Sequence, residues 1–197
     1  MASILNADIA GGLKATGDTS GVLQIQAGSV TVANIASSGV NAGIQVAPYA
    51  APAFRAYVSG SSATVFSNTT WTKITLNAKT FDTNSNFDAT TNYRFTPKVA
   101  GYYQFNGCVQ GTLASVGGST YLVPFIYKNG SIYCFGGEIQ PVNGNTMAVT
   151  TSALIYMNGT TDYAELYSGQ NNGGTFTYQN QGQIYGNWFS GCLVRGA

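Results

Sequence analysis

Histidine is absent from this 197-residue chain, and charged residues make up only 8% of it. The absence of histidine excludes the usual His-based proton relays, Ser-His and Cys-His nucleophile pairs, and His metal ligands. A net charge of +1 disfavours nucleic-acid binding, which needs clustered Lys and Arg to neutralise phosphates. No apolar window of about 18 residues could span a membrane, and the opening segment 1–12 lacks the basic and apolar regions of a secretory signal. We therefore expect neither a nucleic-acid nor a membrane partner.

Carboxylates are also scarce, with seven Asp and Glu in the chain. The pairs closest in sequence are Asp82 with Asp88 and Asp162 with Glu165. Glycoside hydrolysis needs two carboxylates facing a sugar across about 5–10 Å, whereas Asx residues in a polar loop such as 82–88 commonly cap turns. We predict that the protein is not an enzyme and uses no cofactor.

The same loop carries oxygen-bearing side chains at alternating positions, which loosely resembles a calcium-binding loop. The glycine and the closing glutamate that such a loop requires are missing. We interpret the loop as turn chemistry and predict no metal site, with calcium binding as the alternative. The alternating residues are Asp82, Asn84, Asn86 and Asp88.

Three cysteines, Cys108, Cys134 and Cys192, lie far apart in sequence, each within an apolar or aromatic stretch. Their odd number disfavours a fully paired disulfide framework. We expect buried free thiols that behave as small hydrophobic residues. One disulfide and a cysteine metal site are the alternatives, the latter without any CxxC spacing to support it.

The residues that are present favour a β-rich protein. Hydrophobic residues make up 44% and aromatic residues 13% of the chain, which is enough for a sizeable core. Short apolar runs separated by Gly, Asn, Ser and Thr predict strands, and no long stretch keeps a helical apolar period. The predicted fold is an all-β sandwich or jelly roll. Its strand segments are 52–60, 71–76, 93–111, 119–136, 147–169, 174–180 and 184–194.

Turn residues divide three of these segments. Pro97 and Gly101 break the segment 93–111 into two strand runs, because proline cannot continue a sheet ladder. The pairs Asn129-Gly130 and Asn158-Gly159 each predict a tight hairpin, since Asn-Gly suits the two positive-φ positions of a type I′ turn.

Alternation is clearest in the stretch 102–109, where neither face carries a charge. Both faces have aromatic or apolar groups, and a surface that is neither core nor charged suits a buried subunit interface. One face holds Tyr103, Phe105, Gly107 and Val109, and the other holds Tyr102, Gln104, Asn106 and Cys108.

Residues 1–47 differ from the rest, because they have no aromatic side chain and are rich in Ala, Gly, Ser and Val. Alternation on both sides of Gly28-Ser29 predicts a small hairpin. A lone hairpin is barely stable in water and needs a partner surface, so we predict an N-terminal anchoring arm. Residues 48–52 form a Pro-containing linker and residues 53–197 a head domain. The predicted anchoring residues are Leu23, Ile25, Val30 and Val32.

Three motifs follow one another in the head domain. The first is a set of aromatic residues leading to a proline bend and Gly-x-Tyr-x-Phe, the second a Lys-Asn-Gly hairpin, and the third a terminal Phe-Ser-Gly-x-Leu strand. With these motifs, residues 53–197 resemble the C1q-like domain, the globular head of a complement component. The matching residues are Phe81, Phe87, Tyr93, Phe95, Pro97, Gly101, Tyr103 and Phe105, then Lys128-Asn129-Gly130, then Phe189-Ser190-Gly191-Cys192-Leu193.

That resemblance implies a ten-strand jelly roll of the kind shared with tumour necrosis factor. It also implies a homotrimer, in which three heads bury aromatic and aliphatic surface around a three-fold axis. Gly101 and Gly191 would then allow close backbone approach. The residues expected to pack in the core or in the trimer contact are Tyr103, Phe105, Phe125, Tyr156, Phe189 and Leu193.

The stretch 17–23, Gly-Asp-Thr-Ser-Gly-Val-Leu, resembles the opening of many small bacteriophage structural proteins. Joined to a C1q-like head, it implies a homotrimeric virion surface protein, either a capsid decoration protein or a short head fibre. Such a protein would assemble in the host cytoplasm and sit on the particle surface. Its partners would be further copies of itself and another virion protein, such as the major capsid protein or a tail protein.

The alternative function is a tail-fibre tip that recognises a host surface glycan. Exposed aromatic rings stack on sugars and amides hydrogen-bond to them, and the loop 169–183 is rich in amides. The candidate glycan contacts are Trp71, Phe176, Tyr178, Asn171 and Asn172.

Overall fold

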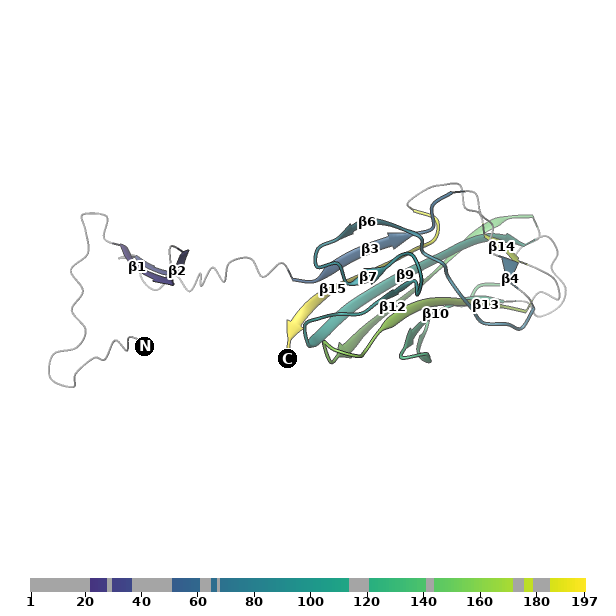
Figure 1. Cartoon of the computed structure of the whole chain (residues 1–197). Helices are drawn as coiled ribbons and strands as arrows, with labels where there is room; N and C mark the ends of the chain where they lie inside the picture. The colour runs from purple at the N-terminus through teal and green to yellow at the C-terminus, as the bar shows by residue number, and fades with distance from the viewer. Residues whose placement is uncertain are drawn as a thin grey trace. The chain divides into compact units, whose positions relative to one another are not determined.

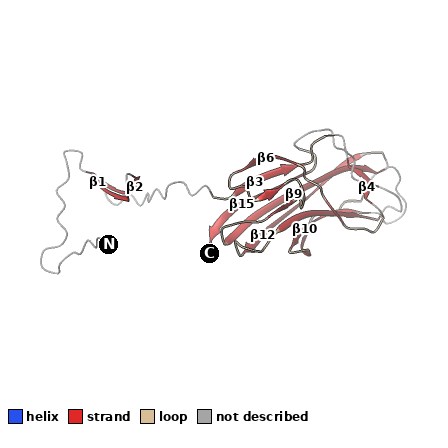
Figure 2. Cartoon of the chain, in the orientation of Figure 1, coloured by secondary structure: helices blue, strands red, loops and turns tan. Residues whose placement is uncertain are grey.

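The computed structural model describes residues 22–27, 30–36, 51–60, 65–66, 68–113, 121–140, 144–171, 176–178 and 185–197. The chain divides into two compact units, Met1–Tyr49 and Ala50–Ala197. The described residues contain strands, turns and loops but no helix, and therefore none that could cross a membrane. Figure 1 follows the chain from end to end, and Figure 2 shows that its regular structure is strand.

The first unit contains a two-stranded antiparallel sheet. β1 (Val22–Ala27) pairs with β2 (Val30–Ala36), from Ala27 opposite Val30 to Val22 opposite Ala36. This pairing confirms the hairpin that the alternation predicted, although the turn residues Gly28 and Ser29 lie outside the described part. Leu23 and Ile25 are on β1, and Val30 and Val32 are on β2.

The second unit is a sandwich of two antiparallel sheets, here called the β9 sheet and the β13 sheet after their central strands. The β9 sheet runs β6 (Ala78–Asp82), β3 (Ala53–Tyr57), β15 (Trp188–Gly196), β9 (Gly101–Leu113), β12 (Thr146–Met157), with β14 (Phe176–Tyr178) and β4 (Val65–Phe66) beyond the end of β15. The β13 sheet runs β7 (Phe87–Asp88), β8 (Arg94–Phe95), β13 (Ala164–Gln170), β10 (Leu122–Lys128), β11 (Ser131–Phe135), with β5 (Thr72–Lys73) also on β13.

The core between the sheets is built on the alternation of β9. Tyr103, Phe105 and Val109 are fully buried, which confirms the face predicted from the sequence. The Tyr103 hydroxyl donates to the Val99 carbonyl at 2.8 Å, so this polar group is satisfied inside the core. Burial raises the pKa of Tyr103 to about 12.

Aromatic rings from several strands join across the core. Phe54 stacks on Phe95 at a ring-centroid distance of 4.4 Å, and Phe105 stacks on Phe189 at 5.5 Å. Gly191 faces these rings, since a Cβ there would lie 2.6 Å from a Phe105 ring carbon. The core therefore requires a residue without a side chain at this point of β15.

The hairpin predicted at Asn129-Gly130 is confirmed. β10 and β11 pair from Lys128 opposite Ser131 outwards. Asn129 and Gly130 have φ values of 53° and 78°, the two consecutive left-handed residues that a type I′ turn requires.

The hairpin predicted at Asn158-Gly159 is wrong. β12 pairs with β9 along its whole length, while β13 lies in the other sheet between β10 and β8. The Asn158 side-chain oxygen accepts hydrogen bonds from the backbone N–H groups of Thr160, Thr161 and Asp162. This wider turn carries the chain from one sheet to the other. The Asn-Gly pair therefore lies in a connection between the sheets and not in a hairpin.

Two further expectations need correction. Within the predicted strand 71–76, only Thr72–Lys73 is strand, although Ile74 and Leu76 are still buried in the core. The cysteines are all free, but only Cys108 is buried, whereas Cys134 is partly exposed and Cys192 is exposed. Cys192 is exposed because it faces outward from β15, opposite Gln104.

Replacement of Phe105 by Ala tests the importance of the β9 core row. We expect Phe105→Ala to lower the free energy of unfolding by about 3–5 kcal/mol, because it leaves a cavity between the sheets. Urea unfolding followed by circular dichroism measures this. Phe81, which is exposed on β6 of the same sheet, is the control, and Phe81→Ala should cost about 1 kcal/mol or less. Equal losses in the two variants would contradict this assignment of the core.

Candidate functional site

The outer face is defined here as the side of β12, β9 and β15 that faces away from the core, and it is formed by alternate residues of these strands. The same side of the sheet continues onto β3. Paired residues of antiparallel strands project to the same side. Tyr156 lies opposite Tyr102, and Leu154 lies opposite Gln104, which in turn lies opposite Cys192. The outer face thus continues across three strands.

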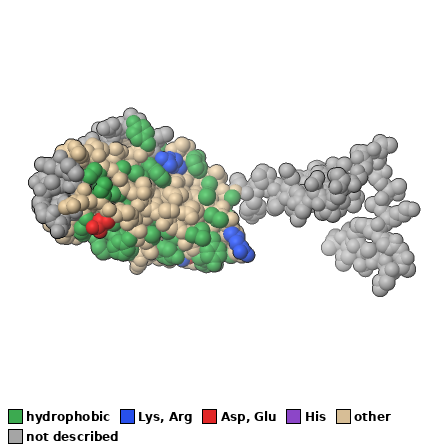
Figure 3. Space-filling model, turned by 180° about the vertical axis from the view of Figure 1, so that it is seen from behind, with side chains coloured by type: hydrophobic (Ala, Val, Ile, Leu, Met, Phe, Trp, Pro, Cys, Tyr) green, Lys and Arg blue, Asp and Glu red, His purple; other side chains and the backbone are tan. Residues whose placement is uncertain are grey.

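The outer face is almost uncharged. Arg195, opposite Tyr102, is the one charged residue within these three described strands. From neighbouring strands, Arg55 stacks over the Trp188 ring at 4.1 Å and the Lys128 ammonium lies 5.9 Å from the Tyr156 ring centroid. Figure 3 shows one face of the molecule, on which apolar and neutral polar groups cover most of the described surface. A surface with so few charges loses little hydration energy when another surface covers it.

One end of the outer face is aromatic and aliphatic. Tyr102 and Tyr156 meet edge to face with their ring centroids 5.5 Å apart, and their exposed fractions are 45% and 41%. Leu154 is 53% exposed and Val194 is 61% exposed. Large apolar side chains gathered in one place on a surface mark interaction sites.

Beside this apolar end lies a polar network that contains no charge. The Gln104 amide donates to the Ser152 hydroxyl at 2.8 Å, and that hydroxyl donates to the Asn106 side-chain oxygen at 2.9 Å. The three side chains therefore pair with one another across β9 and β12. The Gln104 side-chain oxygen and the Asn106 amide nitrogen have no partner among the described residues, so they remain able to hydrogen-bond to a surface that covers this face.

The six residues expected in the core or the trimer contact fall into distinct environments. Tyr103, Phe105 and Phe189 are fully buried in the core of this one chain, and Leu193 packs partly buried against that core. Tyr156 is exposed on the outer face. Phe125 is buried, but in a separate cluster with Val123 and Tyr127.

Sequence reasoning did not single out Leu154 and Val194 as exposed residues of this face. For Leu154, the signal was available in the strict alternation of the segment 147–157, where Ile155 and Met157 are buried. For Val194, the same signal was available, because Val194 alternates with the core-side residues Phe189, Gly191 and Leu193. The register shift between Leu193 and Arg195 instead brings Arg195 to the outer face, which alternation would not predict.

The far side of the β13 sheet carries a second aromatic group. Phe125 contacts Trp71 and Phe135, each with ring centroids 5.0 Å apart, and Tyr127 stacks on Tyr167 at 3.9 Å. Trp71 is 44% exposed and covers Gly169, where a Cβ would lie 2.5 Å from Trp71 Cδ1.

Among the candidate glycan contacts, Trp71 and Asn171 can be placed with their side chains. The Asn171 side-chain oxygen accepts from the Tyr121 backbone N–H at 2.6 Å, so it holds a loop in place. Phe176 and Tyr178 lie on β14, and their side chains, like the residue Asn172, lie outside the described part of the structure.

The carboxylates of the loop 82–88 organise turns. Asp82 accepts hydrogen bonds from the backbone N–H groups of Asn86 and Phe87 and pairs with Lys79 at 3.0 Å. Asp88 accepts from three consecutive backbone N–H groups, those of Thr90, Thr91 and Asn92. These bonds are the turn chemistry expected from the sequence.

The other carboxylate pair does not form a joint site. Asp162 pairs with Lys128 at 2.9 Å, whereas the buried Glu165 pairs with Lys73. Burial acts to raise the pKa of Asp162, but hydrogen bonds from Asn129, Lys128 and Asn158 hold it below its ordinary value. Each carboxylate therefore forms a separate ion pair, Asp162 with Lys128 and Glu165 with Lys73.

Comparisons with known proteins identify the fold. No family model matches the sequence, and no curated protein matches it. Among solved structures, the globular domain of a zebrafish complement 1qA protein matches with a TM-score of 0.52 and 17% identity, over 75% of this chain and 99% of that chain. Eiger TNF from S. frugiperda matches with a TM-score of 0.53 and 8% identity, over 75% and 95%.

A third structure, murine APRIL, matches with a TM-score of 0.50 and 8% identity, over 73% of this chain and 99% of that chain. All three likenesses concern the fold. Together with the strand order of the two sheets, they show that the head is a C1q/TNF-like jelly roll. This confirms the fold class predicted from the sequence.

Replacement of Asp88 by Asn tests the turn role of this carboxylate. Backbone hydrogen bonds from Thr91 and Thr90 hold the pKa of Asp88 well below its ordinary value. A carboxylate with a lowered pKa stabilises the fold above its unfolded pKa of about 4, and that stability is lost as the pH falls through the lower folded value. We expect Asp88→Asn to be less stable than the parent at pH 7, with the difference shrinking below about pH 4. Melting temperatures of the parent and of Asp88→Asn between about pH 2 and pH 7 check this, because that range spans the fall through the unfolded pKa of Asp88. A difference in melting temperature that does not change with pH would contradict the prediction.

Proposed function

We propose that this protein is a homotrimeric, non-enzymatic structural protein on the surface of a bacteriophage particle. Its head associates through the outer face of the β9 sheet, and its N-terminal unit attaches it to the particle. The observation that carries the proposal is that exposed apolar side chains and a neutral polar network share an almost uncharged sheet face. The C1q/TNF-like fold supports it, because the resemblance to that family implies a trimer.

The physical reason for association is the burial of apolar area. Covering exposed tyrosine, leucine and valine side chains contributes roughly 25 cal/mol for each Å² removed from water. The neighbouring Gln104, Ser152 and Asn106 side chains partly pair with one another. The Gln104 oxygen and the Asn106 amide nitrogen can hydrogen-bond across the interface, which offsets the cost of covering them. Closed three-fold symmetry also leaves no complementary surface on which further copies could add.

The N-terminal unit supports attachment to a partner. A two-stranded sheet buries too little surface to be stable alone in water, so β1 and β2 need a surface to pack against. Leu23, Ile25, Val30 and Val32 are the residues that we propose for this contact. The stretch 17–23, with its resemblance to phage structural proteins, favours another virion protein as the partner.

Within this role, a capsid decoration protein or short head fibre is the preferred assignment, and the two-stranded sheet of the N-terminal unit, which needs a surface to pack against, favours it. A tail-fibre tip that binds a host glycan is the second candidate. The exposed Trp71 ring favours it, since sugars stack on such rings. Copy number on purified particles separates them: hundreds of copies indicate the capsid, and a few indicate the tail.

Replacement of Leu154 by Lys tests the interface. We expect the parent to sediment as a trimer and Leu154→Lys to sediment as a monomer, because a buried ammonium without a partner opposes association. The control is Thr70→Lys, which adds the same charge at an exposed loop position before β5. It should remain a trimer.

Sedimentation velocity measures the state of all three proteins, and circular dichroism checks that the strand content is unchanged. A parent that stays a monomer of 20.6 kDa would overturn the proposal. A trimeric Leu154→Lys protein would show that the trimer uses a different face.

Deletion of residues 1–47 tests the attachment. We expect the shortened protein to remain a folded trimer but to be missing from particles assembled in its presence. Quantitative immunoblotting of purified particles measures incorporation relative to the full-length chain. Normal incorporation of the shortened protein would show that the N-terminal unit is not the anchor.

A further inference from the structure

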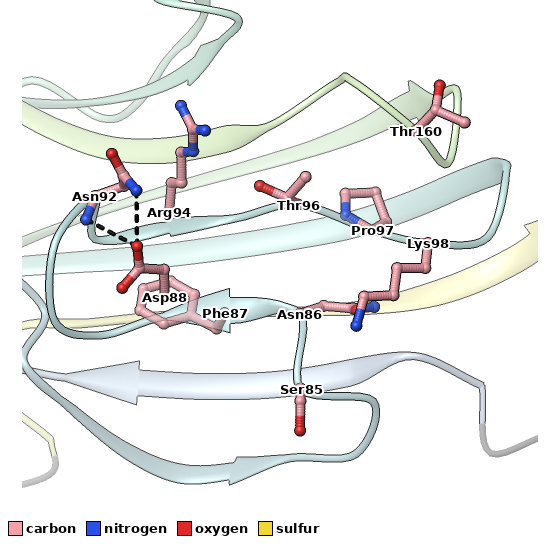
Figure 4. Close-up of a pocket in the computed structure, with 10 residues that line it drawn as sticks. All are labelled: Ser85, Asn86, Phe87, Asp88, Asn92, Arg94, Thr96, Pro97, Lys98 and Thr160. Carbon is pink, nitrogen blue, oxygen red and sulfur yellow. Dashed lines mark hydrogen bonds between the residues drawn. The ribbon is translucent and has the colours of Figure 1, made fainter.

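A pocket separate from the outer face lies where the turns between β6, β7 and β8 come together with the loop between β12 and β13. Its volume is about 330 Å³, close to the lower end of the range of small-ligand sites, roughly 300–1,000 Å³. Figure 4 shows Asn86 and Lys98 at one end of the pocket and Asp88, Asn92 and Arg94 at the other. The residues that line it are Ser85, Asn86, Phe87, Asp88, Asn92, Arg94, Thr96, Pro97, Lys98 and Thr160.

The Asn86 side chain is the first unusual feature of this pocket. Asn86 is 5% exposed, yet neither its amide nitrogen nor its amide oxygen has a hydrogen-bond partner within the described residues. Its backbone, in contrast, is fully engaged, since its N–H donates to Asp82 and its carbonyl accepts from Thr96. A buried polar group is normally satisfied, so this amide offers a donor and an acceptor to which the described residues supply no partner.

The charges around the pocket are the second feature. The ion pairs formed among the described residues are Lys73–Glu165, Lys79–Asp82 and Lys128–Asp162, so they include neither Lys98 nor Arg94. Arg94 is held in position by stacking over the Tyr163 ring at 4.1 Å.

Asp88 is the one carboxylate that lines the pocket, and its hydrogen-bonding capacity is directed into its own loop. Besides three backbone N–H groups, it accepts from the Thr90 hydroxyl and the Asn92 amide. The pocket therefore has two cationic side chains and one carboxylate whose oxygens already accept hydrogen bonds from their own loop. This balance favours an anionic ligand.

We propose that this pocket binds a carboxylate-bearing sugar, such as a uronic acid residue of an acidic polysaccharide. Lys98 pairs with the carboxylate, and the Asn86 amide, which is buried in this structure, turns toward the bound sugar to donate to and accept from its hydroxyl groups. The Thr96 hydroxyl, which points among the other lining side chains in Figure 4, supplies a further neutral contact. The volume exceeds what a simple inorganic anion fills. This site does not depend on the particle role proposed above, because binding can be measured whatever the oligomeric state.

Calorimetric titration of the full-length chain with sodium glucuronate tests the proposal. Glucose, sodium acetate and inorganic phosphate serve as separate probes, since glucose lacks the charge while acetate and phosphate lack the sugar ring. We expect saturable binding of glucuronate that is at least about tenfold tighter than binding of any of the three, because charge and ring contacts act together.

Variants at two positions identify the pocket. Lys98→Gln removes a charge from an exposed side chain and should weaken glucuronate binding by about tenfold or more, whereas Lys98→Arg keeps the charge and should stay within about threefold. Asn86→Ala should also weaken binding, with its melting temperature recorded because Asn86 is buried. If Asn86→Ala fails to fold, the Lys98 pair decides the outcome alone.

Three results would overturn the proposal. The first is equal binding of acetate or phosphate, which would show an anion site without sugar recognition. The second is unchanged affinity in Lys98→Gln, which would place binding elsewhere. The third is no saturable binding of glucuronate, together with an ordered water bonded to Asn86 in a crystal structure, which would show that water alone is the missing partner.

Discussion

The strict alternation of β9 is the constraint on which the rest of the molecule depends. One row of its side chains, including Tyr103 and Phe105, fills the space between the sheets. The other row faces outward and carries no charge. β9 pairs with β12 along its length and with β15 on the other side. Both neighbouring strands therefore also alternate between core-facing and outward-facing side chains. A shift of one residue in this register would exchange core and surface over three strands at once.

The scarcity of charge gives each ion pair a local structural task. Lys128 binds Asp162 where the chain passes from β12 to β13, and also donates to the Tyr156 carbonyl at 2.7 Å. Lys73 similarly connects β5 to the buried Glu165 on β13. The carboxylates in the loop 82–88 are taken up by turns. Few carboxylates are then left to neutralise the pocket cations Lys98 and Arg94, and Arg195 is the one charged residue on the described strands β9, β12 and β15.

The sequence predicted what depends on local chemistry. Period-two alternation identified the two faces of β9, and Asn129-Gly130 identified a hairpin because its turn geometry is set by two residues. Asn158-Gly159 has the same local signal, but the pairing of β12 with β9 is a contact between distant segments that no short pattern reveals. The same limit applies to Phe125, whose apolar environment predicts burial but not which side of the β13 sheet covers it. The Asn86 side-chain amide, which has no hydrogen-bond partner among the described residues, could not be predicted from the sequence. Its environment depends on the positions of all the segments that surround it in the folded chain.

The two proposed surfaces follow opposite physical rules and lie on different strands. The outer face of the β9 sheet is suited to association because it carries exposed apolar side chains and few charges, so another surface can cover it at little cost in hydration. The pocket beside β7 and β8 is suited to a small polar ligand because the described residues supply no partner to the Asn86 side-chain amide. Its lining residues come from segments 85–98 and from Thr160, none of which belongs to β9, β12 or β15. Association through the outer face therefore does not consume the residues that would hold a sugar, and one jelly roll can carry both functions.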